Sequence, residues 1–301
     1  MSPHLSSPFA SRRGFTLVEF MVAIAIGLVV SLVIGQIFVG SRQSFSSQED
    51  LARVQENMRT ASQILSRTIR MAGYRNNPGV DPNTVFPQAS TPAINGADNV
   101  ATAGFTAGRE PDTITVRYQG AGSGAGADGS VVNCLGVAVD FGVMTSNTFA
   151  IRENGRGDGK SLFCSTDGGL TWPAANELVP DIEAMQILYG VDRIGNDTLT
   201  VAQDGAPDYY VRINNVSDID QIVSVRIWLL LRSPSLTNAA VDTLVYNLAG
   251  VNYGPFNDRY VRRALFTTIS LRNRNQSTNS KHSPPARRAA AASPARSSWS
   301  R

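Results

Sequence analysis

Histidine and charge are both scarce in this 301-residue sequence. Its two histidines, His4 and His282, lie near the two ends, so the long stretch between them has none. This excludes histidine-dependent catalytic triads and typical zinc sites from the body of the chain. We therefore expect no catalytic residues and no metal.

A nucleotide cofactor is not expected either. Gly124, Gly126 and Gly129 form a nominal GxGxxG motif, but VVNCLG follows them instead of a helix start. A dinucleotide site needs the amino terminus of a helix to meet the phosphates. The formal net charge is only +3, with the basic excess partly in the last residues, so no broad nucleic-acid surface is expected.

Cysteine is equally rare, with Cys134 and Cys164 as the two examples. They are about thirty residues apart, and strand-like sequence flanks both. This pattern favours one disulfide in an exported domain, and the alternative is a pair of buried free thiols. With 42% hydrophobic residues, the chain can bury one sizeable core, which predicts one principal domain with appendages.

One long hydrophobic run, residues 15–41, has Glu19 as its only charged residue. About 25 apolar residues suffice to cross a bilayer as a helix, so this run is predicted to span a membrane. Arg12 and Arg13 precede it and favour a cytoplasmic amino terminus, which places the chain after residue 42 outside.

The segment differs from an ordinary secretory signal, in which a small-residue cleavage site follows the apolar region. Here the small residue, Gly14, comes before the run. A peptidase at the cytoplasmic face could therefore remove the leader and leave the helix intact.

The sequence GFTLVEF at residues 14–20 resembles the type IV prepilin signature. This resemblance implies cleavage by prepilin peptidase between Gly14 and Phe15, followed by methylation of the new amino terminus at Phe15. It also makes Glu19 the carboxylate that docks a neighbouring subunit. Phe20 departs from the leucine that is usual at its position.

Glu19 is also notable on physical grounds, because an ionised carboxylate within an apolar helix costs a few kcal/mol. A cationic partner is expected, and the free amine at Phe15 of a neighbouring subunit would serve. The alternative is a tolerated charge near the interface of an ordinary single-span anchor.

Beyond the run, the helix is predicted to continue to about Ala72. No proline occurs between Pro8 and Pro78, and Gly73 supplies a stop signal. Apolar or small residues recur with the three-four spacing of one helix face. They are Leu51, Val54, Met58, Ala61, Leu65, Thr68 and Ala72.

Strand patterns follow after a proline-rich and glycine-rich excursion over residues 76–110. The clearest alternation is in DTITVRY (112–118), QIVSVRIWLLLR (221–232) and ALFTTISLR (264–272). Weaker candidates are residues 136–144, 147–153, 209–213 and the stretch around Ile187. The predicted class is α+β, with a long amino-terminal helix packed on an antiparallel β-sheet domain.

Several later segments resemble the PilW family of type IV pilus minor pilins. They are QENMR (55–59), RMAGY (70–74), NCLG (133–136), IEAMQILYGVD (182–192) and TISLRNR (268–274). The resemblance implies a structural protein that primes pilus assembly and lies at the tip, with roles in twitching motility and adhesion. The implied partners are prepilin peptidase, other minor pilins, the major pilin and a PilY-type tip adhesin.

The implied location is the inner membrane, with a single pass and a periplasmic carboxy-terminal domain, and later the pilus at the cell surface. One alternative is a pseudopilin of a type II secretion system, which shares the same signature. Another is a membrane-tethered module that binds DNA or surface ligands, suggested by the basic tail and the glycine-rich loop.

The sequence thus predicts five parts. They are a leader (1–14), a membrane and assembly helix (15–41), its amphipathic continuation (42–75), a β-rich domain (76–274) and a basic low-complexity tail (275–301).

Overall fold

The computed structural model divides into two compact units, residues 1–52 and residues 53–301. The predicted leader up to Arg13, Phe15 and the predicted tail lie outside the described residues. The structure describes residues 14, 16–121, 128–157, 159–193, 205–238 and 240–273.

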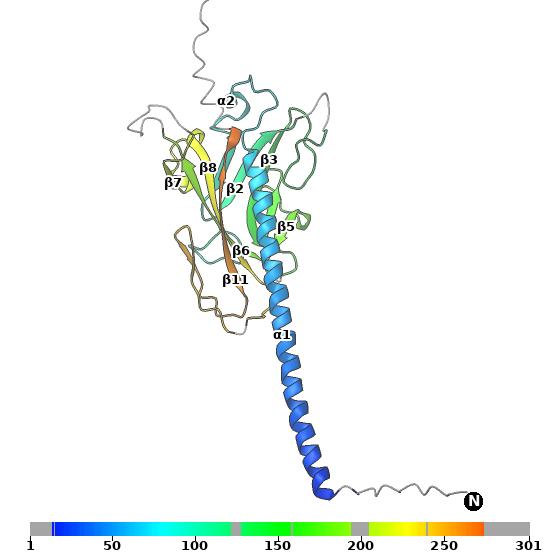
Figure 1. Cartoon of the computed structure of the whole chain (residues 1–301). Helices are drawn as coiled ribbons and strands as arrows, with labels where there is room; N and C mark the ends of the chain where they lie inside the picture. The colour runs from blue at the N-terminus through cyan, green and yellow to red at the C-terminus, as the bar shows by residue number, and fades with distance from the viewer. Residues whose placement is uncertain are drawn as a thin grey trace, which may run out of the picture. The chain divides into compact units, whose positions relative to one another are not determined.

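A single helix, α1 (Leu17–Arg70), runs from the first unit into the second (Figure 1). Its bounds confirm the predicted helix to within two residues at each end. The last turn tightens, because the amides of Met71 and Ala72 donate to carbonyls three residues back. Gly73 then adopts a positive φ of 73°, which L-residues rarely adopt, and the chain leaves the helix.

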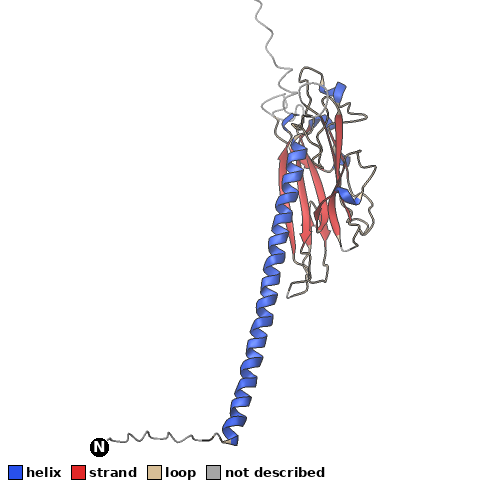
Figure 2. Ribbon diagram, turned by 90° about the vertical axis from the view of Figure 1, so that its right-hand side faces the viewer, coloured by secondary structure: helices blue, strands red, loops and turns tan. Residues whose placement is uncertain are grey.

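In the second unit, α1 buries the face that the sequence predicts. Val54, Ala61, Leu65 and Ala72 are buried, and Ile69 joins them. These side chains belong to the same hydrophobic core as the strands. Figure 2 shows α1 running alongside the strands. The helix stripe therefore forms one wall of the core.

The first sheet has five antiparallel strands in the order β1-β2-β3-β4-β5. They are β1 (Ile94–Ala97), β2 (Thr113–Gln119), β3 (Met144–Glu153), β4 (Lys160–Ser165) and β5 (Glu177–Pro180).

The second sheet has four antiparallel strands in the order β11-β8-β6-β7. They are β11 (Arg262–Ser270), β8 (Ile222–Arg232), β6 (Ile182–Val191) and β7 (Tyr209–Val211). A two-stranded hairpin, β9 (Tyr246–Leu248) and β10 (Val251–Tyr253), packs on Ala184 and Leu230.

Short helices lie in the connections. They are α2 (Pro82–Val85), η1 (Ala174–Asn176), η2 (Ile213–Asn215) and η3 (Ile219–Gln221). The predicted excursion over residues 76–110 thus holds two four-residue elements, α2 and β1.

Both sheets and the helix stripe contribute to one core. Phe149 and Ile114 come from the first sheet, Ile187 and Val225 from the second, and all four are essentially inaccessible to solvent. The predicted α+β class is confirmed, with the antiparallel strands divided between two sheets.

Residues 136–144 do not form the strand that their sequence predicts; β3 begins only at Met144. Gly136 and Gly142 have positive φ values of 80° and 73°, which interrupt an extended chain. The Asn133 side chain also accepts the amides of Leu135 and Val137, each at 3.0 Å, and folds this segment into a turn.

Candidate assembly site

The amino terminus of α1 is capped by a reciprocal pair of side chains, Thr16 and Glu19. The backbone amide and the hydroxyl of Thr16 each donate to Glu19 Oε2 at 3.0 Å. In return, the Glu19 amide donates to Thr16 Oγ1 at 3.3 Å. This arrangement is a capping box, which satisfies amides that a helix start leaves without partners.

The sequence contains a signal for this cap that the prediction of Glu19 did not use. The spacing Thr16-x-x-Glu19 is the capping-box pattern, placed directly before an apolar run. Glu19 therefore has partners within its own chain, and it is also exposed. The carboxylate carries a charge near the positive end of the helix dipole and remains accessible to a further cation.

Gly14 is exposed, and a Cβ atom built on it would meet nothing within 4 Å. Phe15, the predicted first residue of the processed chain, lies outside the described residues. The structure thus leaves the predicted cleavage position open to solvent.

The first part of α1 exposes apolar side chains on all sides. The helix is long and apolar enough to cross a membrane, and its most apolar window has no burial within the chain. A helix that is apolar all round needs a membrane or a bundle of neighbouring helices to cover it. The exposed residues include Leu17, Phe20, Met21, Ile24, Leu28, Leu32, Ile34, Ile37 and Phe38.

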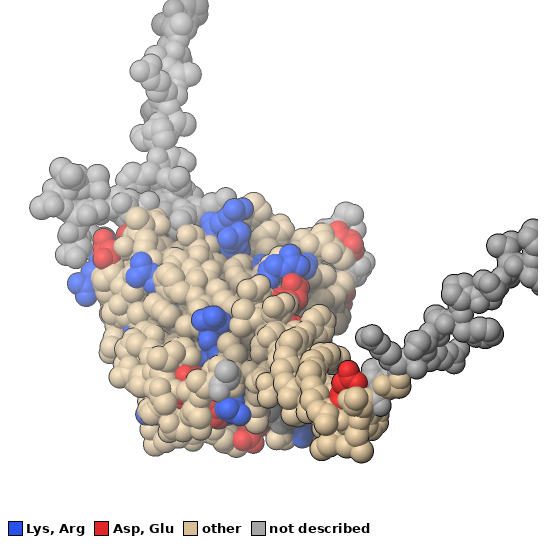
Figure 3. Space-filling model, turned by 60° about the horizontal axis from the view of Figure 1, so that its bottom comes forward, with Lys and Arg blue, Asp and Glu red and all other residues tan. Residues whose placement is uncertain are grey.

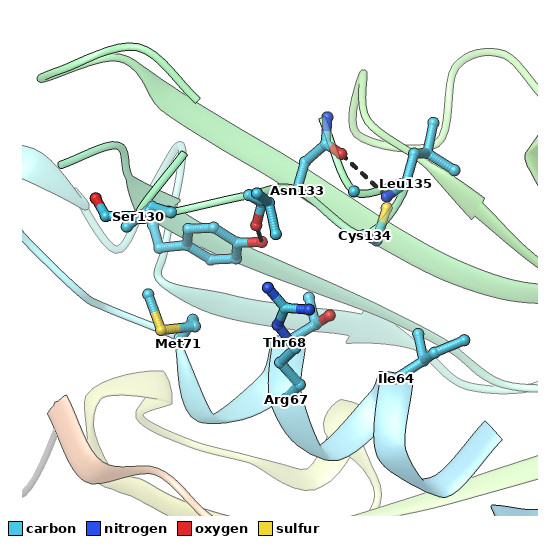
Figure 4. A pocket seen from close by; sticks show the side chains of 12 residues that line it. Ile64, Arg67, Thr68, Met71, Ser130, Asn133, Cys134 and Leu135 are labelled. Atoms are coloured by element: carbon cyan, nitrogen blue, oxygen red, sulfur yellow. Dashed lines mark hydrogen bonds between the residues drawn. The ribbon is translucent and has the colours of Figure 1, made fainter. Parts of the chain in front are cut away.

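In the second unit, the disulfide borders a hollow of about 310 Å³. The structure joins Cys134 to Cys164, with the two Cα atoms 6.4 Å apart, which confirms the predicted pairing. Figure 4 shows the hollow between α1 and the segment 130–136, with Arg67 pointing from the helix toward it.

No residue that lines this hollow is an acid or a histidine, so Arg67 has no partner there for acid–base chemistry. Tyr118 lines it as well and donates to the carbonyl of Val132 at 2.8 Å. Burial raises the pKa of Tyr118 to about 12, so its hydroxyl stays a hydrogen-bond donor. Among the described residues, no group of three or more His, Cys, Asp or Glu side chains could hold a metal ion.

Comparison with known families covers both the span and the body. Residues 9–35 match the model of the prokaryotic N-terminal methylation motif. Residues 148–273 match the model of the type IV pilus-assembly protein W. The chain is a PilW-like type IV pilin.

Among solved structures, a type IV-like pilin from Thermus thermophilus is similar, with 13% identity and a TM-score of 0.41. The similarity covers 73% of this chain and 98% of that one. No curated protein matches the chain.

The PilW match ends at Asn273, which closes the carboxyl end of α1. Its Nδ2 lies 3.3 to 3.4 Å from the carbonyl oxygens of Arg70, Met71 and Ala72. The last described residue of the PilW-like body is thus tied to the helix, about 200 residues earlier in the chain. Terminal carbonyls of a helix lack partners within the helix, and the Asn273 side chain supplies one.

The same PilW-matched region contains a buried guanidinium, that of Arg262 at the start of β11. Its side chain is 1% exposed and binds three carboxylates, with Glu183 at 2.6 Å, Asp242 at 3.2 Å and Asp258 at 2.6 Å. Burial works against the charged form, but the hydrogen bonds that Arg262 donates to Asp258 and Glu183 outweigh it and raise the pKa of Arg262. Arg262 thereby fixes the β8–β11 connection to β6.

A second polar cluster joins the two sheets around Asp112, which precedes β2. Asp112 accepts the amides of Asn99 at 2.9 Å and Ile187 at 2.7 Å. Arg212 lies 3.7 Å from Asp112 and hydrogen-bonds to Gln186 on β6. Burial is the main reason why the pKa of Asp112 is raised to about 7.

Proposed function

We propose that this chain is a minor pilin that primes assembly of a type IV pilus and occupies a position near its tip. The observation that carries the proposal is the uncovered apolar part of α1, residues 17–41, whose one carboxylate, Glu19, lies at its start. The helix would enter a bundle of pilin helices, and the β-rich body would remain outside that bundle. The role is structural and involves no catalysis.

The residues of the span take specific parts in this proposal. Prepilin peptidase cleaves between Gly14 and Phe15, and Phe15 becomes the methylated amino terminus. Glu19 then docks the amine at Phe15 of the adjacent subunit. The methylation-motif match over residues 9–35 and the exposure of Gly14 and Glu19 support these assignments.

The proposed organisation of the chain has a leader at residues 1–14, a span at 15–41 and the amphipathic continuation of the helix at 42–75. The domain at 76–274 would lie in the periplasm before assembly and on the pilus afterwards. Other minor pilins, the major pilin and a PilY-type tip adhesin are the proposed partners, with roles in adhesion and twitching motility.

The role of Glu19 is tested in cells with two substitutions, Glu19→Ala and Glu19→Gln. Glutamine can still accept the Thr16 amide in a capping box, whereas alanine cannot. Glutamine has no charge, however, so it cannot pair with an amine as a carboxylate does. Crosslinked envelopes are used to capture partner pilins, and surface pili are counted.

We expect both variants to be cleaved normally and both to lose partner capture and piliation. Glu56→Ala is the matched control, because Glu56 is an exposed acid on the same helix outside the span. If Glu19→Gln captured partners as well as the natural chain, the carboxylate would be only a helix cap. Unchanged capture in both variants would remove the docking role altogether.

A further inference from the structure

The connection between β8 and β9 exposes an apolar surface, which we call the loop patch, residues 234–238 and 240–245. Its four large apolar side chains are Leu236, Val241, Leu244 and Val245, which are 56%, 48%, 63% and 54% exposed. An exposed apolar surface of this kind marks contact with a partner or a membrane.

The loop patch presents no charge to its surroundings. From Ser233 to Gly250, the only charged residue in the sequence is Asp242. Its side chain is 4% exposed and is bound by Arg262, and the Tyr246 hydroxyl donates to it at 3.2 Å. The one charge of the segment is therefore buried and neutralised.

The same contacts hold the patch in place. The Leu244 amide donates to Asp242 Oδ1 at 3.1 Å. The Asp242 amide donates to the carbonyl of Asp258, and the Asp242 carbonyl accepts the amide of Asn257. The apolar side chains are thus displayed outward on an anchored backbone, because the polar groups around Asp242 are paired inward.

The loop patch lies at the end of the second unit where that unit's part of α1 begins. Pro234 shares a small hollow with Arg53 and Asn57 of α1. In Figure 1 this segment lies at the opposite end of the body from α2. Figure 3 turns that end toward the viewer and shows broad uncharged areas between scattered charged side chains.

The chain reaches this end of the body soon after the predicted span. Arg53 follows Ser41, the last residue of the predicted span, by twelve residues, and α1 is continuous between them. Twelve helical residues extend about 18 Å, so Arg53 cannot lie farther than this from the end of the span, at any angle between the two units. The headgroup layer itself is roughly 5 to 8 Å thick on each side of the hydrocarbon core.

We propose that the loop patch is a second membrane contact, in which Leu236, Val241, Leu244 and Val245 enter the lipid surface beside the span before the chain joins a filament. Apolar side chains on an uncharged, anchored segment suit the interfacial region, where binding follows the buried apolar area. The inference rests on the membrane anchoring in the proposed function.

The test uses the full chain in nanodiscs of phosphatidylethanolamine and phosphatidylglycerol, with a diazirine in the upper acyl chain of the phosphatidylglycerol. After irradiation, trypsin releases the loop patch in one peptide, residues 233–259, because Arg232 and Arg259 flank it. We expect lipid adducts on this peptide and on the span peptide that ends at Arg42. The peptide 161–193 should remain unlabelled.

Leu244→Asp should lower the labelling of the loop-patch peptide several-fold, because a carboxylate is expelled from lipid. Val245→Asp, at a second exposed position, should have the same effect. Leu170→Asp is the matched control, since Leu170 is an 83% exposed leucine on the turn after β4. Leu170→Asp should leave the labelling of the loop-patch peptide and of the span peptide unchanged.

Two results would overturn the inference while the anchoring stands. The loop-patch peptide could carry no more label than 161–193 while the span is labelled, or its labelling could stay unchanged in Leu244→Asp and Val245→Asp. An unlabelled span would overturn the membrane anchoring and the inference together.

Discussion

At the scale of single residues, Asp112 is a carboxyl group whose pKa is raised by burial. Its carboxyl lies among Asp98, Arg212, Gln186 and Tyr189, at the junction of the two sheets. Burial disfavours the ionised form, and the pKa of Asp112 rises to about 7, whereas a carboxyl in an unfolded chain has a pKa near 3.9.

The folded chain therefore holds the Asp112 proton over a pH range in which the unfolded chain has lost it. Because the folded state binds more protons between about pH 4 and pH 7, the free energy of unfolding should fall as the pH rises through this window. Asp112→Asn removes the titration and should flatten that part of the profile. Urea unfolding of the full chain in micelles, followed by tryptophan fluorescence at several pH values, measures it.

Asp140→Asn is the control for this experiment, because Asp140 is an exposed aspartate in the same unit. Its pH profile should follow that of the natural chain. Parallel profiles for Asp112→Asn and the natural chain would show that Asp112 does not govern the pH dependence.

Glu19 and Asp112 differ in how far the sequence reveals their environment. Glu19 stands out because a charge within an apolar run is conspicuous. Asp112 sits before DTITVRY like any strand-flanking aspartate, and only the packing of the two sheets shows that it is buried. The Thr16-x-x-Glu19 spacing alone predicts the helix cap, but the charge of Glu19 within an apolar run is the more conspicuous feature.

At the scale of elements, Arg262 decides whether β11, β6 and the β8–β9 connection stay together. Arg262→Ala would leave the carboxylates of Glu183, Asp242 and Asp258 with no guanidinium between them. Breaking a buried ion cluster from one side typically costs about 3 to 5 kcal/mol. We expect a loss of this size in the free energy of unfolding, measured by urea titration of the full chain in micelles.

The neighbouring Arg263 is exposed and provides a matched control on the same strand. Arg263→Ala should change the free energy of unfolding by only about 0.5 kcal/mol. Equal losses of unfolding free energy in the two variants would mean that the ion pairs of Arg262 do not stabilise the fold more than an exposed arginine on β11 does.

The strands that the sequence predicts are mostly those long enough to show alternation of apolar residues. β2 and β8 bury the apolar residues that alternate in their sequences, whereas β11 fully buries only Ile269 among its apolar residues. All three strands are confirmed, as are the weaker candidates at β3, β6 and β7. The short strands β1, β5, β9 and β10 have three or four residues, too few for a period to emerge. β4 buries nearly every residue, so its sequence shows no alternation.

At the scale of the whole molecule, the proposed processing determines where the mature chain begins. We expect mass spectrometry of the protein from cells with active prepilin peptidase to find a chain that begins at a methylated Phe15. The reason is that Gly14 is exposed directly before the span, where a peptidase at the membrane face can reach it. An intact Met1 in such cells would contradict the prepilin assignment.

The architecture of the whole molecule was only partly predictable. A helix followed by strands was evident, as was a disulfide between the two cysteines, because both depend on local pattern and composition. The division into two sheets was not, because it is set by pairings between distant residues, such as β8 with both β6 and β11. The contact of Asn273 with α1 also joins residues that are far apart in the sequence, so no local sequence pattern predicts it.

That contact has a practical consequence for labelling the protein. Asn273 holds the end of the described body against the carboxyl end of α1, at the other end of the second unit from the loop patch. A fluorescent protein or an affinity tag that replaces the residues after Asn273 is therefore attached at the end of the second unit remote from the loop patch. Such a reporter would leave the loop patch unobstructed.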